Sequence, residues 1–585
     1  MTTRARVRAI LLVIGVFVVA GCALAGWRAW HVRSELLEAR TAAERLRAAV
    51  DARDLDEARR ALEVLSGHSA RAHEQTGGPT WRALSWAPVV GDDVEAVRTL
   101  SVALDDLARG GVSPVLDLVA SLEDGGLAPE AGRFPVDSLV ELHGTVASSL
   151  GVFERAQDDM AALAAGDYLT PVEDARTELA DVLGSATRTL AQADKSLQIL
   201  PGMLGAEQPR QYLLVLQNNA EIRSTGGFPG SVFVLRTDGG KVDLVEPVAG
   251  ATFPVLDEPV IPLDQAESAL FTDEAGRQFV DGNTIPDYGR AAEIFAAHWA
   301  RRFGNQVDGV ISADPVTLSY LLGVTGPVPV GEVTLTEENA VDELLSRTYE
   351  RLPNPEDQDA FFRAAGTAAF SAILEAQDVA GAVSAVSRAV DEGRVLVHSF
   401  VPREARVLDT TRIAGLRRQP PGQRPQVGVY VNDDTGDFGS KLSYYLRYDA
   451  RVVSRRCGAD GQRLHGSFVM RSETPPDPAI LPAYVTGGTP GVPLGAQDLV
   501  LFLVAPEGGD LTRVRVDGEV VPARIVRWQG RPAVRVAHRL GAGKGLQVDW
   551  DMTTAPGQLG DIDVSVTPPV TAGNASSTAR SACTG

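Results

Sequence analysis

The sequence predicts a multidomain α+β protein with a transmembrane helix, a helical stalk, an α/β core and a C-terminal β-sandwich. Three observations predict this order. An apolar run follows arginines at the start of the chain, and apolar residues then recur at helical spacing to about residue 200. Strands alternate with helices beyond that point, and short strands separated by Gly, Pro and Asp turns dominate after residue 427. The 585 residues suffice for roughly four domains of ordinary size.

The composition excludes several classes of protein. A hydrophobic fraction of 44% and a charged fraction of 22% exclude wholesale disorder, collagen and a polytopic transporter. The 55 Lys and Arg against 76 Asp and Glu give a net charge of −21, so no nucleic-acid partner is expected. The 8 histidines are scattered, with no H-x-H or H-E-x-x-H pair, so the sequence does not predict a zinc enzyme.

Residues 1–8 are predicted to be a cytoplasmic tail and residues 9–27 a transmembrane helix. Arginines before the apolar run favour a cytoplasmic N-terminus, which places the bulk of this single-pass cell-membrane protein outside the cytoplasm. An uncleaved signal anchor competes with two alternatives. One is a cleaved signal peptide. The other is a lipoprotein, because residues 19–22 loosely resemble a lipobox ending at Cys22, although the residues after Cys22 stay apolar as a continuing span would.

Residues 28–204 are predicted to form a helical stalk or bundle. The clearest helix starts at Thr170, where Glu173 is placed to close a capping box, and Pro201 is expected to end it. The tryptophans of the break at residues 80–88 are expected to plug a helical core. We interpret the region as a spacer, with a partner-binding bundle as the alternative. Two earlier runs have helical spacing: Leu36, Ala39, Ala43, Leu46 and Val50, then Leu55, Ala58, Leu62 and Leu65.

Four further segments follow. Residues 205–400 alternate strands with helices and are predicted to be an α/β core. The Arg-, Pro- and Gln-rich composition of residues 401–426 predicts a linker. Residues 427–570 are the predicted β-sandwich and residues 571–585 a tail.

The two cysteines outside the apolar run are Cys457 and Cys583. In an oxidising compartment they are a natural pair for one disulfide. Two unpaired thiols are the alternative.

The segment 217–230 holds the densest group of candidate ligand-binding residues. Its Gly226-Gly227 pair lets the backbone approach a ligand closely. The guanidinium of Arg223 suits phosphate or carboxylate, and the backbone N–H groups of residues 225–227 suit an anion. The alternative is a polar turn whose side chains satisfy the local backbone. The candidates in the segment are Asn218, Asn219, Glu221 and Arg223.

Three stretches carry a family resemblance. They are Tyr212–Phe228, Asp308–Ile311, and Asn432–Thr435 together with Ser440–Tyr445. In this order and spacing they resemble the bacterial family known as domain of unknown function 4012, and they cover about residues 205–560. The resemblance implies a membrane-anchored protein.

Residues 210–375 are distantly similar to the LytR–CpsA–Psr phosphotransferases, which transfer glycans from polyprenyl pyrophosphate to the cell wall with magnesium. The similarity lies in a helix, strand and Gly-rich turn at residues 288–330 and in arginine-bearing helices at residues 338–369. It implies a phosphate-binding role for several arginines. The predicted phosphate-binding set is Arg223, Asn218, Asn219, Arg347, Arg351 and Arg363, with Glu221, Asp287 and Asp359 as supporting acids.

Two positions depart from the pattern of the phosphotransferases. Ser224-Thr225 stands where that family has a magnesium-binding aspartate after the first arginine. Residues 246–252 read Glu-Pro-Val-Ala-Gly-Ala-Thr where that family has Pro-Arg-Asp. Catalytic and metal-binding residues are therefore left unassigned, and Mg²⁺ is expected only if the core is catalytic.

The sequence thus predicts a cell-envelope protein that binds a polyprenyl-(pyro)phosphate-linked glycan or a wall polymer. Two alternatives remain open. One is an active phosphotransferase that attaches such glycans to the wall. The other is a non-catalytic envelope scaffold that binds partner proteins.

Overall fold

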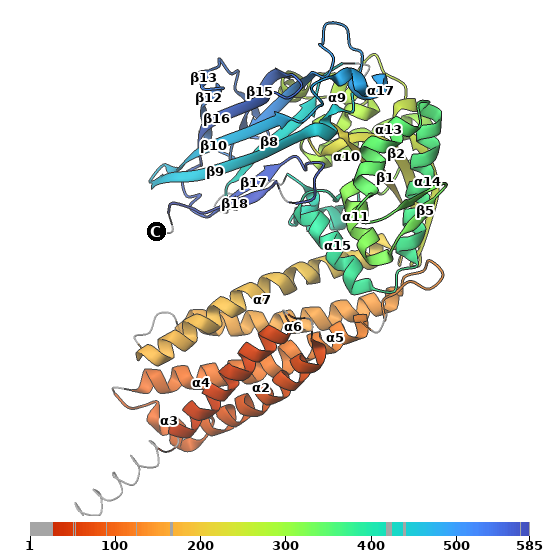
Figure 1. The fold of residues 1–585 in the computed structure, drawn as a ribbon. Coiled ribbons are helices and arrows are strands. Elements are labelled where there is room, and N and C mark those ends of the chain that lie inside the picture. Colours follow the sequence, from red (N-terminus) through yellow and green to blue (C-terminus); the bar gives the residue numbers. More distant parts are fainter. Residues whose placement is uncertain are drawn as a thin grey trace, which may run out of the picture. The chain divides into compact units, whose positions relative to one another are not determined.

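The computed structural model describes residues 27, 29–50, 52, 54–88, 90–123, 126–163, 168–416, 424–436, 440–573 and 575–583. The predicted transmembrane segment and Cys22 lie outside these residues, apart from Trp27. Within the described part of the chain, none of the helices combines the length and apolar character that a bilayer crossing requires. The fold is mixed α/β and divides into two compact units (Figure 1). The first contains the residues before Ala128 together with Asp137–Leu200, and the second contains Ala128–Val136 and everything from Pro201 onward.

The first unit is built from helices. Apolar stripes pack against each other, as between Ala42 of the first helix and Ala61 of α2. Trp81 is buried and donates to the Val94 carbonyl at 2.8 Å, but Trp86 is 89% exposed, so the prediction that both tryptophans plug the core is wrong for Trp86. The helices are residues 29–50, α2 (Leu55–Thr76), α3 (Pro79–Leu84), α4 (Gly91–Asp106), the π-helix η1 (Leu107–Val112), α5 (Ser113–Glu123), α6 (Val136–Leu163) and α7 (Thr170–Met203).

The last of these helices, α7, ends later than the sequence predicted. It begins at Thr170 as expected, but the Glu173 carboxylate pairs with Arg176. It also continues past Pro201, which the sequence had placed at its end, and Pro201 lies inside its last turn.

A five-stranded sheet of order β3-β2-β1-β4-β7 forms the centre of the α/β part of the second unit. Its first strand pairs antiparallel with β2 and parallel with β4, so the carboxyl ends of β1 and β4 lie at the same edge. One face is covered by α10, whose Phe295 joins the core of the sheet. The elements are β1 (Arg210–Arg223), β2 (Gly226–Asp238), β3 (Lys241–Ala249), α8 (Gln265–Phe271), α9 (Glu274–Arg277), α10 (Tyr288–Phe303), β4 (Gly309–Ala313), α11 (Pro315–Thr325), β5 (Val328–Val330), β6 (Val333–Leu335), α12 (Ala340–Asp342), the π-helix η4 (Glu343–Arg347), α13 (Thr348–Arg351), α14 (Pro355–Leu374), α15 (Val379–Asp391) and β7 (Leu396–Ser399).

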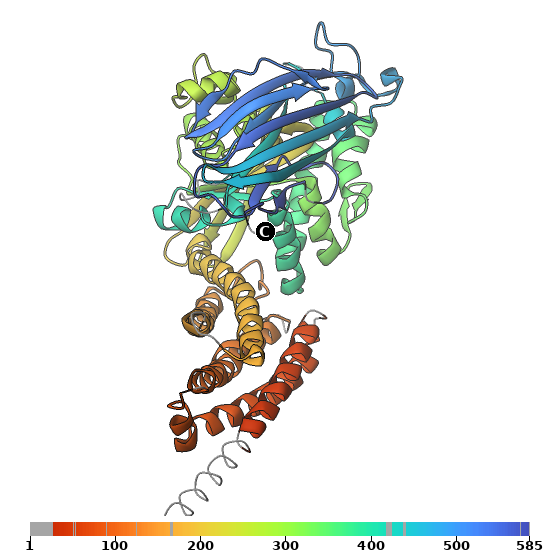
Figure 2. The same ribbon diagram turned by 90° about the vertical axis from the view of Figure 1, so that its left-hand side faces the viewer.

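Two further sheets stack around one hydrophobic core. Their strand orders are β13-β12-β16-β10-β9 and β14-β15-β11-β8-β17-β18. Figure 2 shows strands of the sandwich side by side, coloured cyan to blue. The outer face of the second sheet is also buried, because Phe502 and Trp528 pack against Phe271 of α8. The strands are β8 (Gln426–Asp433), β9 (Leu446–Gly458), β10 (Gly461–Ser472), β11 (Gln497–Val504), β12 (Asp510–Val516), β13 (Glu519–Val520), β14 (Val526–Trp528), β15 (Arg531–Leu540), β16 (Gly545–Thr553), β17 (Ile562–Val566) and β18 (Ser577–Ala579).

The segment predicted as a linker carries α16 (Pro402–Leu408) and the 3₁₀ helix η5 (Arg412–Ala414). Residues 417–423 of that segment lie outside the described residues.

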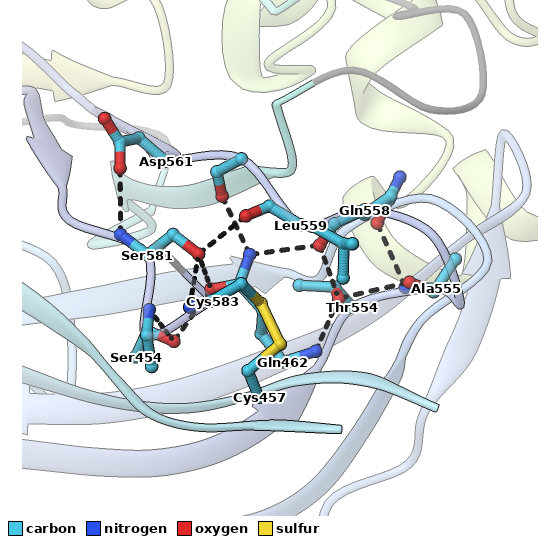
Figure 3. Close-up of a disulfide and its surroundings, with 12 residues drawn as sticks. Ser454, Cys457, Gln462, Thr554, Ala555, Gln558, Leu559, Asp561, Ser581 and Cys583 are labelled. Atoms are coloured by element: carbon cyan, nitrogen blue, oxygen red, sulfur yellow. Dashed lines mark hydrogen bonds between the residues drawn. A yellow bond between two sulfur atoms is a disulfide. The ribbon is translucent and has the colours of Figure 1, made fainter. Parts of the chain in front are cut away.

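The C-terminal segment is fixed to the sandwich. A disulfide joins Cys457 of β9 to Cys583 with an S–S distance of 2.11 Å, as the sequence predicted (Figure 3). Next to it, the Ser581 hydroxyl donates to the Leu559 carbonyl at 2.7 Å, and the Ser581 N–H donates to Asp561 at 2.9 Å. Together with the pairing of β18 on β17, these contacts hold Ser577–Cys583 on the sandwich.

Candidate functional site

An apolar cavity of about 100 Å³ lies at the carboxyl end of β4, beside Leu216–Asn218 of β1, where the parallel pairing of the two strands ends. Ligands of open α/β sheets bind outside the carboxyl ends of parallel strands, and small-molecule pockets are mostly apolar with a few placed polar groups. This place is therefore the candidate functional site. Its walls include Leu216, Asn218, Ala313, Asp314, Leu344, Leu345, Phe362 and Ala365.

Asn218 connects the cavity to a cluster of aromatic rings. Its amide donates to the Tyr349 hydroxyl, and its side-chain oxygen accepts from the Ala220 N–H at 3.0 Å. The Tyr349 ring centre lies 5.8 Å from that of Phe362, which lines the cavity, and 5.7 Å from that of Tyr484. The cluster thus reaches from the cavity to Tyr484, whose side chain is half-exposed.

Lys441 lies beside these rings in an ion pair with Glu221. Its ammonium is 4.9 Å from the centre of the Tyr484 ring and 5.4 Å from that of Tyr349. Burial lowers the pKa of Lys441 below its ordinary value. The contacting Glu221 carboxylate opposes this effect because it stabilises the ammonium form, so Glu221 serves as the partner of a buried lysine.

Arg347 of η4 and Arg363 of α14 lie on helices that also carry cavity residues, and Arg351 lies on α13, which directly follows η4. Arg347 and Arg351 both pair with Glu343, at 3.3 and 2.9 Å, and keep 58% and 38% of their side chains exposed. Arg363 is exposed on α14 beside Asp359, whose pKa burial raises and Arg363 lowers. None of these three arginines is among the described residues that line the cavity.

Arg223 does not join the other predicted arginines. Its guanidinium donates to Asp281 at 3.2 Å and to the backbone carbonyl of Asp433 in β8 at 3.2 Å. Burial raises the pKa of Asp281 above its ordinary value, and Arg223 opposes that shift. The next residue, Ser224, receives a hydrogen bond from Thr567 at 3.0 Å and contacts Asn432. The hairpin that follows β1 therefore joins the α/β part to the sandwich.

Asn219 lies in a buried network around Arg394. It donates to Asp314 at 3.1 Å and is 1% exposed, so it does not face a free surface. Asp314 is the N-cap of α11 and accepts from the Thr317 N–H at 2.8 Å. Arg394 donates to Asp314 at 2.9 Å and to Glu392 at 2.6 Å.

The residues present do not fit a magnesium site. Within the described residues, no three His, Cys, Asp or Glu side chains gather as metal ligands. Asp314, the carboxylate of the cavity wall, already accepts from the Thr317 N–H and hydroxyl, Asn219 and Arg394. Asp287 lines a different, polar cavity of about 530 Å³, where it accepts from the Arg290 N–H and from Gln529.

One comparison with known proteins places this region in a family. Residues 207–349 match the family model described as Protein of unknown function (DUF4012). The match supports the DUF4012 family for this segment, which contains β1, β4 and Arg347 of η4. No curated protein matches the chain. The remaining motif of the resemblance, residues 432–445, lies outside the DUF4012 segment but packs on it through Asn432 and Lys441.

Sequence reasoning missed several residues of the site. Tyr349 lies between the paired arginines of the stretch 338–369 but was not singled out, and Asp281 and Arg394 stand in no motif that was used. Lys441 offered a signal, because it is one of four lysines in the chain and lies in a quoted motif. Arg394 has no comparable signal in the sequence.

Proposed function

We propose that this protein is a single-pass membrane protein of the cell envelope whose extracytoplasmic α/β core binds a polyprenyl-(pyro)phosphate-linked glycan. The observation that carries the proposal is the apolar cavity where the pairing of β1 with β4 ends, walled in part by η4 and α14, which bear Arg347 and Arg363, with Arg351 one turn beyond Arg347. Apolar walls suit an isoprenoid chain, and guanidinium groups suit phosphate. At the start of the chain, Arg4, Arg6 and Arg8 followed by the apolar run support the membrane anchor.

The size of the cavity limits how much of the lipid it would hold. A volume of about 100 Å³ is similar to the roughly 150 Å³ of a cavity that holds benzene. The cavity would therefore take about one isoprenoid unit, next to the phosphate groups. Burying five carbons contributes about 4 kcal/mol, and the phosphate contacts of the arginines would supply most of the remaining affinity.

Binding is proposed rather than transfer, because the acids near the cavity are already engaged. Asp314 accepts four hydrogen bonds, and Glu221 pairs with Lys441. A general base needs a lone pair directed at the proton that it removes. The likeness to the LytR–CpsA–Psr enzymes is accordingly proposed for the fold and the ligand class, and the activity is not carried over.

A second candidate function is a non-catalytic scaffold. It is favoured by the use of Arg223 and Glu221, predicted ligand residues, as internal links between the α/β part and the sandwich. In this case the core would hold no lipid, and wall polymer or partner proteins would bind elsewhere on the surface.

The test is equilibrium binding of a long-chain polyprenyl phosphate to the full chain in lipid nanodiscs. Losing a charge-assisted contact costs about 1.5 kcal/mol or more, so Arg347→Gln and Arg351→Gln should each weaken binding roughly tenfold or more. Arg455→Gln is the matched control, because Arg455 is exposed on β9 of the sandwich. Saturable binding that only the first two variants weaken supports the proposal. Absent binding, or equal affinity in all variants, contradicts it and favours the scaffold.

A further inference from the structure

The exposed tryptophans of the described chain gather at one end of the helical unit. Trp27, Trp30 and Trp86 are 58%, 63% and 89% exposed. The other tryptophans, Trp81, Trp299, Trp528 and Trp550, are at most 6% exposed. A single exposed apolar side chain is ordinary, but several gathered at one place mark a site of interaction with a protein or a membrane.

Side-chain contacts show that the first helix and α2 place these tryptophans together. The first helix ends at residue 50 and α2 begins at Leu55, and two packed helices joined by so few residues are antiparallel. Glu35 pairs with His68 at 2.6 Å and with Arg71 at 2.9 Å, which fixes the level at which they face each other. Trp30, about one and a half turns before Glu35, is therefore level with the end of α2 at Thr76, where α3 begins. Trp86 follows directly after α3.

Two more apolar residues lie at the same end. Trp81 of α3 bonds the Val94 carbonyl near the start of α4, and Asp93 accepts from the Leu169 N–H at 2.8 Å at the start of α7. Leu169 is 60% exposed and Val90 39% exposed. Figure 1 shows α3 and the starts of α4 and α7 at one end of the helical unit. The exposed apolar side chains thus come from loops before α4 and α7 as well as from the first helix.

We propose that this end of the helical unit docks on the lipid bilayer, with Trp86 and Leu169 entering the boundary between headgroups and acyl chains. The proposal rests on the membrane anchor of the proposed function. The chain continues from Trp27 into the apolar run of residues 9–27, so this end is the one that would face the membrane. Tryptophan is enriched at that boundary because its ring is apolar and its N–H is polar.

The loop of Trp86 has a composition that fits this surface. Residues 85–90 read Ser-Trp-Ala-Pro-Val-Val, and the exposed Arg82 lies one turn before Trp86. Arginine at this position suits lipid phosphates. A second contact beside the anchor would fix the tilt of the helical unit, which a single transmembrane helix leaves free.

The test is depth-dependent quenching of tryptophan fluorescence in the full chain in nanodiscs with brominated lipids. The difference in emission between the natural chain and Trp86→Phe isolates Trp86, and Trp30→Phe isolates the tryptophan next to the anchor. Both substitutions lie at exposed side chains, so the fold is preserved. The proposal expects the Trp86 emission to be quenched by brominated lipid and shielded from aqueous acrylamide.

Three other results would contradict the proposal, and each points to a different cause. Lipid quenching of Trp30 but not of Trp86, with Trp86 open to acrylamide, leaves the anchor intact and rejects the docking surface. Shielding of Trp86 from both quenchers shows a protein contact, such as a second copy of this chain, in place of the bilayer. Lipid quenching of neither tryptophan rejects the membrane anchor itself.

Discussion

Replacement of Arg394 by methionine should destabilise the second unit strongly. The Arg394 side chain is 0% exposed and donates to Asp314 at 2.9 Å and to Glu392 at 2.6 Å. It also donates to the backbone carbonyls of Pro569 at 2.8 Å and Thr571 at 2.7 Å. Methionine fills a similar volume but removes the arginine that pairs with Asp314 and one of the two arginines that pair with Glu392. Removing one partner of a buried ion pair costs about 3–5 kcal/mol, so we expect a loss of about 4 kcal/mol in the free energy of unfolding.

The assay is urea unfolding followed by the fluorescence of Trp528 and Trp550, which are buried in the second unit. The matched control is Arg388→Met, because Arg388 pairs with the same Glu392 at 3.2 Å but is 53% exposed. Exposed pairs contribute at most about 1 kcal/mol. A loss below about 1.5 kcal/mol for Arg394→Met, or equal losses for the two variants, would refute the reasoning.

Three further predictions concern stability. Burial lowers the pKa of His298 to about 4 from 6.5. As the pH falls from 6.5 to about 4, the unfolded chain binds a proton at His298 that the folded chain does not bind, and the free energy of unfolding falls by about 3 kcal/mol. His298→Gln should remove this loss of stability between pH 7 and pH 4, as measured by urea titration at each pH. The same loss in the variant and the natural chain would contradict the prediction. The Cys457–Cys583 disulfide spans 126 residues, so Cys583→Ser should cost about 2–4 kcal/mol, and an unshifted urea midpoint contradicts it. Arg223→Met should cost about 3–5 kcal/mol, because it removes the partner of the largely buried Asp281, while polyprenyl phosphate affinity stays unchanged. A loss of affinity without a loss of stability would return Arg223 to the ligand site.

The pattern of the sequence predicted much of the fold, because periodicity depends on local burial. The predicted helix at the start of residues 288–330 corresponds to α10, and the short apolar strands of the sandwich correspond to β8 to β12, β15 and β16. Burial of β8 on both faces could not be predicted, since its outer partners come from residues 265–303. The burial of Trp86 was predicted wrongly, because the sequence of a helix break does not show whether its tryptophan rings point into the core or toward solvent.

The candidate site was harder to predict, because the partners of its charged residues lie far away in the sequence. Arg223 bonds Asp281, which is 58 positions away, and Asp433, which is 210 positions away. A single sequence shows an arginine suited to phosphate but cannot show that a carboxylate already occupies it. Arg347 and Arg351 remain candidates because their partner Glu343 leaves much of each side chain exposed.

The most direct measurement of the central claim uses a substitution that fills the cavity. Ala365 is buried on α14 and lines the cavity, so Ala365→Leu adds three carbons to its free space. Filling it should raise the free energy of unfolding by up to about 2 kcal/mol. The same variant should lower polyprenyl phosphate affinity at least tenfold, or about 1.4 kcal/mol.

Ala369→Leu, one turn along α14, is the matched control. Ala369 is buried but is not part of the cavity wall, so overpacking should cost about 1–3 kcal/mol. The affinity of this control for the lipid should stay that of the natural chain. Opposite changes of stability and affinity in Ala365→Leu would establish that the lipid occupies this cavity. Unchanged affinity in Ala365→Leu would contradict a core that binds polyprenyl phosphate there.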